Sequence, residues 1–362
     1  MASARARRKG AAELLGPAPL VVVSERPFNA ESPYSQQLGL LTPVDRFYVR
    51  SHFGLNQAPG AEDWRLEVSG AVQQPLSLSL ADLLGLPARS LIATLECAGN
   101  GRRYLEPPVP GEQWALGAVS TAEWAGVSLS EVLARAGIAA GALEVLFAGV
   151  DRGPSPVDGA TIRFERSLPL EQALHPDVLL AYAMNGAPLT ADHGAPLRLV
   201  VPGWYGMASV KWLCSIEVLR APFRGVFQAD RYVYDFGDGR PVEPVTSMRV
   251  RALIAQPTPG ARIPASGAQV RGWVWSGAAP IAGVEVSDDG GETWVQAELG
   301  ARVSPYAWCA WQYRWRPSRP GAHTLLARAR DASGAAQPLA PDWNRLGYGN
   351  NAVQRVEVQV GE

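Results

Sequence analysis

The strongest constraint on the fold is a change of pattern near Val245. From there to the end of the chain we find no helical periodicity, and short runs of β-branched or alternating apolar residues recur between turn signals. These runs are Met248–Ala255, Gln269–Trp275, Val284–Val286, Thr293–Ala297, Trp308–Trp315, His323–Ala329 and Val353–Val360. About seven strands of this kind are typical of an immunoglobulin-like β-sandwich. The sequence therefore predicts a sandwich domain over residues 246–362.

Residues 46–245 carry both strand and helix patterns, which predicts a mixed α/β domain and an α+β chain overall. The expected strands are Trp64–Val68, Leu76–Leu80, Leu91–Glu96, Leu197–Val201 and Val210–Val218. Ser128 and Glu131 have the spacing of a capping box, so a helix is expected from there to Gly137. A second short helix is expected at Leu168–Leu174. Residues 1–45 are expected to form an N-terminal arm.

Composition excludes several classes of function. Lys and Arg total 33 against 34 Asp and Glu, so a net charge of -1 offers no general attraction to a nucleic acid backbone. The early apolar run Leu14–Val23 is interrupted by two prolines and is half the roughly 20 residues of a membrane span. Three widely spaced cysteines fit neither a disulfide framework nor a zinc site. We expect a cytoplasmic protein, or a periplasmic one if an export signal is missing from this start.

Cys97 is the first candidate for a reactive group. It follows a predicted strand and precedes a turn rich in Gly and Asn, after which come Arg102 and Arg103. Nearby positive charge favours the thiolate, which is the form that binds metals or attacks electrophiles. The alternative is a buried structural thiol, which is the interpretation we give to Cys214 and Cys309 inside their predicted strands.

Several further segments place polar side chains at strand ends or on one face. Arg50 and His52 alternate along an extended segment, which suits an oxyanion, although a surface pair would have the same spacing. His193 precedes a predicted strand, and a loop histidine capped by Asp192 is the alternative there. Tyr232 lies where an exposed tyrosine of a domain linker would ordinarily be found.

Taken together, these segments resemble the sulfite oxidase family of molybdenum enzymes from about residue 46 to the C-terminus. The matching stretches are Tyr48 to His52, Ala93 to Asn100, Met184 to Gly186, Asp192 to Arg198, Ser209 to Trp212 and, at the end of the sandwich, Trp343 to Gly347. The resemblance implies a molybdopterin-binding domain followed by an immunoglobulin-like dimerisation domain. A homodimer is therefore expected.

The resemblance also implies a molybdopterin cofactor whose molybdenum takes one protein ligand, Cys97. By the family pattern, the cofactor would be held by Tyr48, Val49, Arg50, Ser51, His52, Asp151, His193, Arg198, Ser209, Val210 and Lys211. Arg50, Arg102 and Tyr232 match the anion pocket of the family. The implied reaction is oxidation of sulfite to sulfate, with electrons passed to an external acceptor such as a cytochrome c. Lys211, the lysine outside the N-terminal arm, then has a role.

The chain departs from the family pattern in two places. Gly101 stands where animal enzymes have an arginine, and Arg345 is one place out of step with an arginine that reaches the substrate in some members. A less cationic pocket is therefore expected. No C-x-x-C-H haem attachment motif is found, so no haem is expected in this chain.

Other functions stay open at this stage. Within the same fold, the alternatives are oxidation of a sulfane, organic or protein-bound sulfur compound, reduction of nitrate, and reduction of a sulfoxide. Absence of haem and flavin modules disfavours nitrate reduction, and the predicted sandwich disfavours a sulfoxide reductase. Outside this class, Cys97 with His52 or His193 would suit a thiol hydrolase, and the sandwich alone would suit a binding protein.

Overall fold

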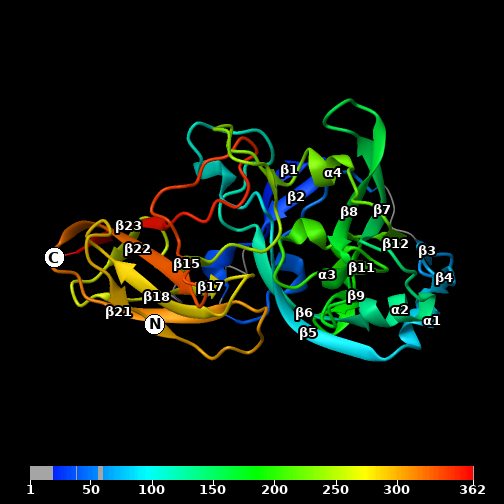
Figure 1. Ribbon diagram of the computed structural model, residues 1–362. Helices are drawn as coiled ribbons and strands as arrows, with labels where there is room; N and C mark the ends of the chain where they lie inside the picture. The colour runs from blue at the N-terminus through cyan, green and yellow to red at the C-terminus, as the bar shows by residue number, and fades with distance from the viewer. Residues whose placement is uncertain (1–18, 38, 56–59, 362) are drawn as a thin grey trace, which may run out of the picture.

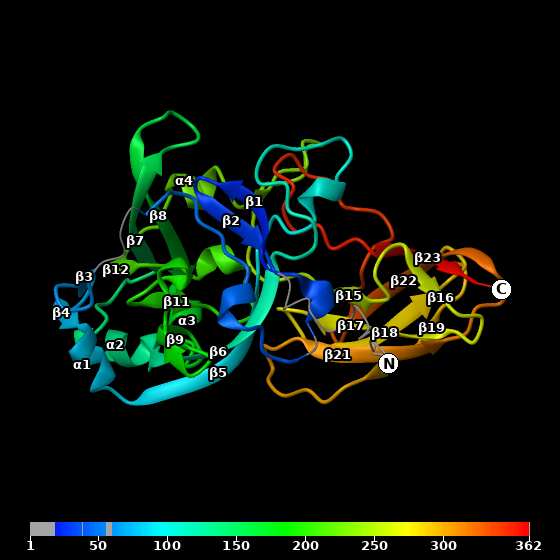
Figure 2. The same ribbon diagram turned by 180° about the vertical axis from the view of Figure 1, so that it is seen from behind.

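The structure is a computed structural model that describes residues 19–37, 39–55 and 60–361. It has two parts that lie side by side, a mixed α/β domain and a β-sandwich at the C-terminal end (Figure 1). The view from behind shows the long strand β5 (Ala88–Glu96) running toward the junction between them (Figure 2). Cys97 follows directly after this strand.

Two sheets form the mixed domain. The first has the order β10-β9-β6-β5, with β11 also paired to β9: β6 (Val119–Ser128), β9 (Leu179–Met184), β10 (Ala187–Pro188) and β11 (Arg198–Val200). The second has the order β4-β3-β12-β7-β8: β3 (Arg65–Gly70), β4 (Leu76–Ser79), β7 (Glu144–Pro154), β8 (Thr161–Pro169) and β12 (Leu213–Leu219). Only the pair β3 and β12 is parallel in these two sheets as described. Two small hairpins accompany them: β1 (Val21–Glu25) with β2 (Phe28–Glu31), and β13 (Val233–Tyr234) with β14 (Glu243–Pro244).

The helices of this domain are short: α1 (Leu80–Leu84), α2 (Leu129–Ala136), α3 (Leu170–Ala173) and α4 (Val226–Ala229). α2 forms because Leu129, Val132, Leu133 and Ala136 recur at helical spacing and become buried, and it ends at Gly137 with φ +67°. The expected helix is confirmed, but the expected capping box is wrong. The Ser128 hydroxyl contacts Ser130 and the carbonyl of Pro176 instead. A reciprocal capping box does form at the start of α1, between Ser79 and Asp82.

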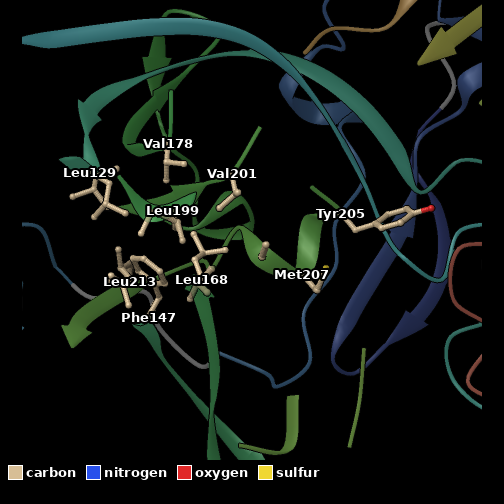
Figure 3. Close-up of a cluster of buried hydrophobic side chains, with 14 of the residues drawn as sticks. Leu129, Phe147, Leu168, Val178, Leu199, Val201, Tyr205, Met207 and Leu213 are labelled. Atoms are coloured by element: carbon tan, nitrogen blue, oxygen red, sulfur yellow. The ribbon is translucent and has the colours of Figure 1, made fainter. Parts of the chain in front are cut away.

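The core of the mixed domain lies between its two sheets. Figure 3 shows Phe147 and Leu213 from the second sheet facing Leu129 and Leu199, with Tyr205 and Met207 farther along the same cluster. Two sequence-predicted boundaries change here. The strand expected from Val210 begins at Leu213, and the helix expected at Leu168–Leu174 is shortened to the single turn of α3, because Leu168 and Pro169 belong to the end of β8. Residues 201–212 form a loop with one 3-10 turn at Gly206–Ala208, and side chains of this loop can line a site.

The C-terminal domain is the predicted sandwich, with no α-helix among its described residues. A four-stranded sheet, β15-β17-β21-β20, packs against a five-stranded sheet, β16-β23-β22-β18-β19. The strands are β15 (Arg251–Gln256), β16 (Ala261–Ile263), β17 (Ala268–Trp275), β18 (Ile281–Ser287), β19 (Val295–Gln296), β20 (Glu298–Leu299), β21 (Cys309–Trp315), β22 (Gly321–Asp331) and β23 (Gln354–Val360). β16 and β20 are too short to have shown a periodicity in the sequence.

The two domains share one hydrophobic core cluster. Trp273 and Trp308 belong to it and stack with ring centroids 4.7 Å apart. Their indole N–H groups donate to the carbonyls of Gln37 and Leu40, at 3.2 and 2.8 Å. The described part of the predicted N-terminal arm, 19–37 and 39–45, is therefore bound to both domains, and its β1–β2 hairpin contacts Val49. The basic residues at positions 5–9 lie outside the described residues.

Because the core is continuous across the junction, we predict that Trp308→Ala lowers the free energy of unfolding of the whole chain. The expected loss is about 3–5 kcal/mol, since a fully buried indole and its hydrogen bond are removed together. Chemical denaturation followed by tryptophan fluorescence and by far-UV circular dichroism measures it. The matched variant Trp308→Phe should lose about 1–2 kcal/mol. Two separate transitions in the wild type would contradict a shared core.

Candidate active site

Cys97 occupies the first position after β5, in a turn held from both sides. Its backbone N–H donates to the carbonyl of Ala118 at 2.8 Å, and its carbonyl accepts from Asn100 at 2.9 Å. Gly101 follows with φ +85°, a conformation that a side chain disfavours. Cys97 is 6% exposed and lines a cavity that opens to solvent.

The electrostatics of Cys97 differ from the sequence-based expectation. Burial raises the pKa of this thiol above its ordinary value, while Arg50 and Arg102 lower it by smaller amounts. The protein alone therefore favours the thiol, and the expectation that nearby arginines favour the thiolate is wrong because desolvation is the larger effect. A bound metal cation would reverse this balance, since a coordinating thiol is deprotonated.

Arg50, His52 and Tyr232 form a hydrogen-bonded chain along one wall of the cavity. Arg50 Nη2 lies 2.9 Å from His52 Nδ1, and His52 Nε2 lies 2.5 Å from the Tyr232 hydroxyl. The alternation in the sequence correctly places Arg50 and His52 together. Tyr232 is 3% exposed, so the alternative of an exposed linker tyrosine is wrong.

The direction in which these hydrogen bonds are donated follows from the chemistry of Arg50. Arginine can only donate, so His52 Nδ1 accepts and, in a neutral imidazole, Nε2 carries the proton. Burial lowers the pKa of His52 well below 6.5, with smaller contributions from Arg50 and Lys211, so the ring is neutral near pH 7. His52 then donates to the Tyr232 oxygen. The tyrosine proton remains free to be donated to a ligand in the cavity, and burial raises the pKa of Tyr232 so that the proton is retained.

Aromatic rings pack against this hydrogen-bonded series of side chains, and its tyrosine has an unusual backbone conformation. Phe164 from β8 stacks on His52 with centroids 4.9 Å apart, and Phe227 from α4 packs on it at 4.6 Å. Tyr232 has φ +56°, which is rare for a residue with a side chain. The guanidinium of Arg166 lies 5.6 Å from the Tyr232 ring centroid and donates to the carbonyl of Phe227. Sequence patterns contained no signal for either phenylalanine or for Arg166.

Lys211 also lines the cavity. Its ammonium donates to the Ser51 hydroxyl at 2.8 Å and to the carbonyl of Asp192 at 2.9 Å, and it lies 4.1 Å from the Trp212 ring centroid. Burial lowers the pKa of Lys211 to about 7, and Arg198 lowers it further while Asp151 raises it. An anion bound beside this group would restore its ordinary charge. Trp212 has φ +51°, so it is a second lining residue, after Tyr232, with a left-handed backbone.

Arg198 and His193 are two further lining residues of the cavity. Arg198, the first residue of β11, donates to the carbonyls of His193 and Ser209 at 3.0 and 3.1 Å. His193 Nε2 donates to the carbonyl of Val44 at 3.1 Å, so the alternative of a loop histidine capped by Asp192 is wrong. Burial lowers the pKa of His193 to about 4, and Arg198 adds to the shift. The Ser209 hydroxyl accepts from the N–H of Val201.

Asp151 is a carboxylate that lines the cavity and can accept hydrogen bonds from an amino group of a ligand. Its Oδ1 is buried and has no hydrogen-bond partner among the described residues. Burial raises the pKa of Asp151 to about 6, and Lys211 lowers it by a smaller amount. An orphaned acceptor of this kind is costly unless a ligand satisfies it. The Nε of Arg198 is also buried without a partner in the described part of the chain.

Most of the sequence-predicted residues meet at this cavity. Those that line it are Tyr48, Arg50, Ser51, His52, Cys97, Asp151, His193, Arg198, Ser209, Lys211 and Tyr232. The structure does not place Val49, Val210 or Arg102 in the lining. Arg102 lies behind it, where its guanidinium donates to the carbonyls of Glu112 and Leu346. Other residues also line it, of which Leu95, Asp192 and Trp212 lie in the family motifs and the rest had no predicted role: Phe47, Leu95, Phe164, Asp192, Gly206, Met207 and Trp212.

Arg345, the second position at which the chain departs from the family pattern, lies outside the cavity. Arg345 forms a salt bridge with Asp235 at 3.3 Å and its side chain is 60% exposed. It does not line the cavity. The cations that do so are Arg50, Arg198 and Lys211.

Comparisons with known proteins define the class. A family model described as the oxidoreductase molybdopterin binding domain matches residues 52–227, and one described as the Mo-co oxidoreductase dimerisation domain matches residues 242–361. The chain thus has the two domains of a molybdopterin oxidoreductase. Among the described residues, no three His, Cys, Asp or Glu side chains could together hold a metal ion. Nor does any helix of the described part have the length and apolar character needed to cross a membrane.

Relatives then identify the family. Sulfite oxidases of Gallus gallus and Mus musculus are each 38% identical to this chain, over 93% and 94% of its length and 77% and 66% of theirs. A nitrate reductase of Brassica napus is 32% identical over 94% of the chain and 41% of its own. The crystal structure of the sulfane dehydrogenase SoxCD from Paracoccus pantotrophus covers 99% of the chain with a TM-score of 0.84, at 28% identity and 94% coverage of that chain. The chain belongs to the sulfite oxidase family, as its sequence motifs predict.

We predict that His193 makes the cofactor-free protein sensitive to acid. Below pH 6.5 the unfolded chain takes up a proton at this residue, whereas the folded chain does so only near pH 4, so stability falls as the pH falls across this window. Between pH 7 and 4.5 this group alone should cost about 2–3 kcal/mol. Urea denaturation of wild type and His193→Gln at both pH values measures it, with exposed His175→Gln as the control. Equal pH dependence in wild type and His193→Gln would contradict the assignment.

Proposed function

We propose that this protein oxidises sulfite to sulfate by oxygen-atom transfer at a molybdenum centre and passes the electrons to an external acceptor. The single observation that supports it best is the cavity itself. One buried thiol faces it, with cations on its walls and a tyrosine proton free to meet a ligand. An anion that accepts hydrogen bonds, and a metal with one protein ligand, both suit this arrangement.

Molybdopterin fits the donor set. The partnerless Asp151 Oδ1 suits the amino and N–H groups of a pterin, and Lys211, Arg198 and Ser209 suit its phosphate. Gly206 lets Tyr48 pack at the cavity, because an added Cβ there would lie 2.5 Å from the Tyr48 hydroxyl. When bound, the cofactor supplies a molybdenum centre that exchanges an oxygen atom and electrons with the substrate. Cys97 would be the ligand that the protein contributes.

The protein residues then orient and neutralise the substrate. Arg50, fixed by Asn29 Oδ1 at 3.3 Å and by His52, would offset one negative charge of sulfite. Tyr232 would donate its proton to a substrate or product oxygen without giving it up, since its pKa is raised. Arg102, buried beside Tyr348 with its guanidinium 5.1 Å from that ring centroid, adds positive charge from behind the wall. The balanced reaction adds one oxygen from water to sulfite and releases two protons and two electrons.

The proposed reaction needs an electron acceptor. We propose a one-electron carrier such as a cytochrome c, because the two electrons released by sulfite must leave the active site before the next turnover. The match of residues 242–361 to a dimerisation domain supports a homodimer.

A second candidate is oxidation of sulfane sulfur. Two observations favour it: the match to the sulfane dehydrogenase spans nearly the whole chain, and Arg345 pairs with Asp235 at the surface instead of adding charge to the cavity. A less cationic pocket would accept a substrate with less charge than sulfite. Measuring turnover with sulfite, thiosulfate, an organic persulfide and nitrate side by side separates the candidates.

We predict that protein produced in a host that makes the cofactor contains near-stoichiometric molybdenum and reduces a dye with sulfite as donor. In Cys97→Ser, dye reduction should fall to background because the protein ligand is lost. Elemental analysis and the dye assay on the same samples measure both. Cys214 lies in β12, and its thiol donates to the carbonyl of Ala148 in β7. The control variant Cys214→Ser should keep both the molybdenum content and the dye reduction. Absence of molybdenum from the wild type would refute the proposal, whereas molybdenum without sulfite turnover would favour the second candidate.

For Tyr232→Phe we predict a fall in kcat/KM for sulfite of about 10–100-fold with unchanged molybdenum content. The variant removes both the acceptor of the His52 proton and the donor to the ligand. Tyr234→Phe is the matched control, since Tyr234 is a buried neighbour that does not line the cavity. Steady-state kinetics and elemental analysis measure these two quantities. Equal kcat/KM in wild type and Tyr232→Phe would show that Tyr232 does not donate a hydrogen bond to the substrate.

A further inference from the structure

The residue before Cys97 carries a buried charge that no step described above uses. Glu96 is the last residue of β5, and its side chain is 2% exposed. Its Oε1 accepts from Arg251 Nη1 at 2.9 Å and from Asn100 Nδ2 at 3.0 Å, and its Oε2 accepts from the Trp275 indole at 2.9 Å. Both carboxylate oxygens are therefore satisfied without water.

Two of these three donors come from the sandwich domain. Arg251 begins β15, Trp275 ends β17, and the two residues face each other as cross-strand partners. Their relative position is therefore fixed by the sheet and not by the mixed domain. A buried carboxylate paired in this way is strongly destabilised if one partner is removed, because a charge or acceptor is then left without a partner.

The rest of the turn is bound by the same domain. The Gly349 N–H donates to the carbonyl of Ala98 at 2.7 Å, and Asn350 Nδ2 donates to the carbonyl of Gly101 at 2.8 Å. Gly101 also makes room for these contacts, because a Cβ there would lie 3.0 Å from Arg251 Nη2. The turn that presents Cys97 is thus fixed by groups of the sandwich domain on one side and by Ala118 on the other.

We propose that Glu96, Arg251 and Trp275 are positioning residues for Cys97, so that the sandwich domain forms part of the active site as well as serving in dimerisation. Through the Glu96 carboxylate, these residues hold the thiol-bearing turn at the angle needed for metal ligation. The proposal rests on the proposed function, in which Cys97 is the molybdenum ligand. It assigns to the sandwich a direct influence on the geometry of the ligand.

A pair of matched variants tests it. Trp275→Phe removes the indole N–H that contacts Glu96 and leaves a ring in the core. Trp315→Phe removes an indole bond to a carboxylate in the same domain, because the Trp315 indole donates to the partly buried Asp288 carboxylate at 2.8 Å, and Trp315 is as buried as Trp275. Chemical denaturation measures the stability that each variant loses, and the loss should be larger in Trp275→Phe because the Glu96 carboxylate is buried.

The readouts report on Cys97 and not on folding. In the holoenzyme, the electron paramagnetic resonance spectrum of the Mo(V) state should shift in Trp275→Phe and match the wild type in Trp315→Phe. In cofactor-free protein, the rate of Cys97 alkylation by iodoacetamide, followed by peptide mass spectrometry, should rise about tenfold in Trp275→Phe alone, as expected when a hydrogen bond to a charged group is lost. Equal spectra and equal alkylation rates in both variants would overturn the proposal.

The two proposals can fail separately. If the wild type held no molybdenum, the proposed function would fail, while the alkylation rates would still show whether the sandwich holds the Cys97 turn. If molybdenum were bound but neither readout changed in Trp275→Phe, the proposed function would stand and the positioning role would be wrong.

Discussion

The buried carboxylate of Glu96 is the contact on which the organisation of this protein depends. It receives donors from both domains at the point where β5 ends and the Cys97 turn begins. Because an unpaired charge at this depth would be costly, the two domains must pack in the arrangement that satisfies it. The shared core of Trp273 and Trp308 then supplies the apolar burial that makes this packing stable. The reactive thiol lies at the junction as a result.

The electrostatics of the cavity point to an anionic ligand with a metal. Burial lowers the pKa values of Lys211 and Arg198 to about 7 and about 10, and a bound anion would raise them again. Burial also raises the pKa of the Cys97 thiol in the same cavity, and a bound metal cation would favour the thiolate. A cofactor that carries both a phosphate and a metal would offset both pKa shifts, the phosphate that of the cations and the metal that of the thiol. This local pattern is invisible in the net charge of -1, since surface charges balance the total.

Sequence patterns predicted those parts of the molecule that depend on local chemistry. The sandwich follows from period-2 runs, the strand end at Cys97 follows from its Gly and Asn turn, and the pairing of Arg50 with His52 follows from their alternation. The family motifs added Asp151 and the residues at 193, 198, 209 and 211, all of which line the cavity. Their roles toward a cofactor remain predictions.

The remaining features depend on tertiary contacts that no local pattern encodes. Ser128 lacks its capping bond because its hydroxyl is directed to Ser130 and to the carbonyl of Pro176, to which it donates. Tyr232 is buried because its left-handed backbone turns the side chain toward His52. The partnership of Glu96 with Arg251 joins residues that are far apart in the chain, and Phe164 and Phe227 reach His52 from separate elements.

X-ray absorption at the molybdenum edge tests the central claim most directly. The claim is that Cys97, presented at the junction of the two domains, is the protein ligand of the metal. Comparing cofactor-loaded wild type with Cys97→Ser, the account predicts that the variant has one sulfur neighbour fewer around molybdenum. The same number of sulfur neighbours in both proteins would contradict it and return Cys97 to the role of a buried structural thiol.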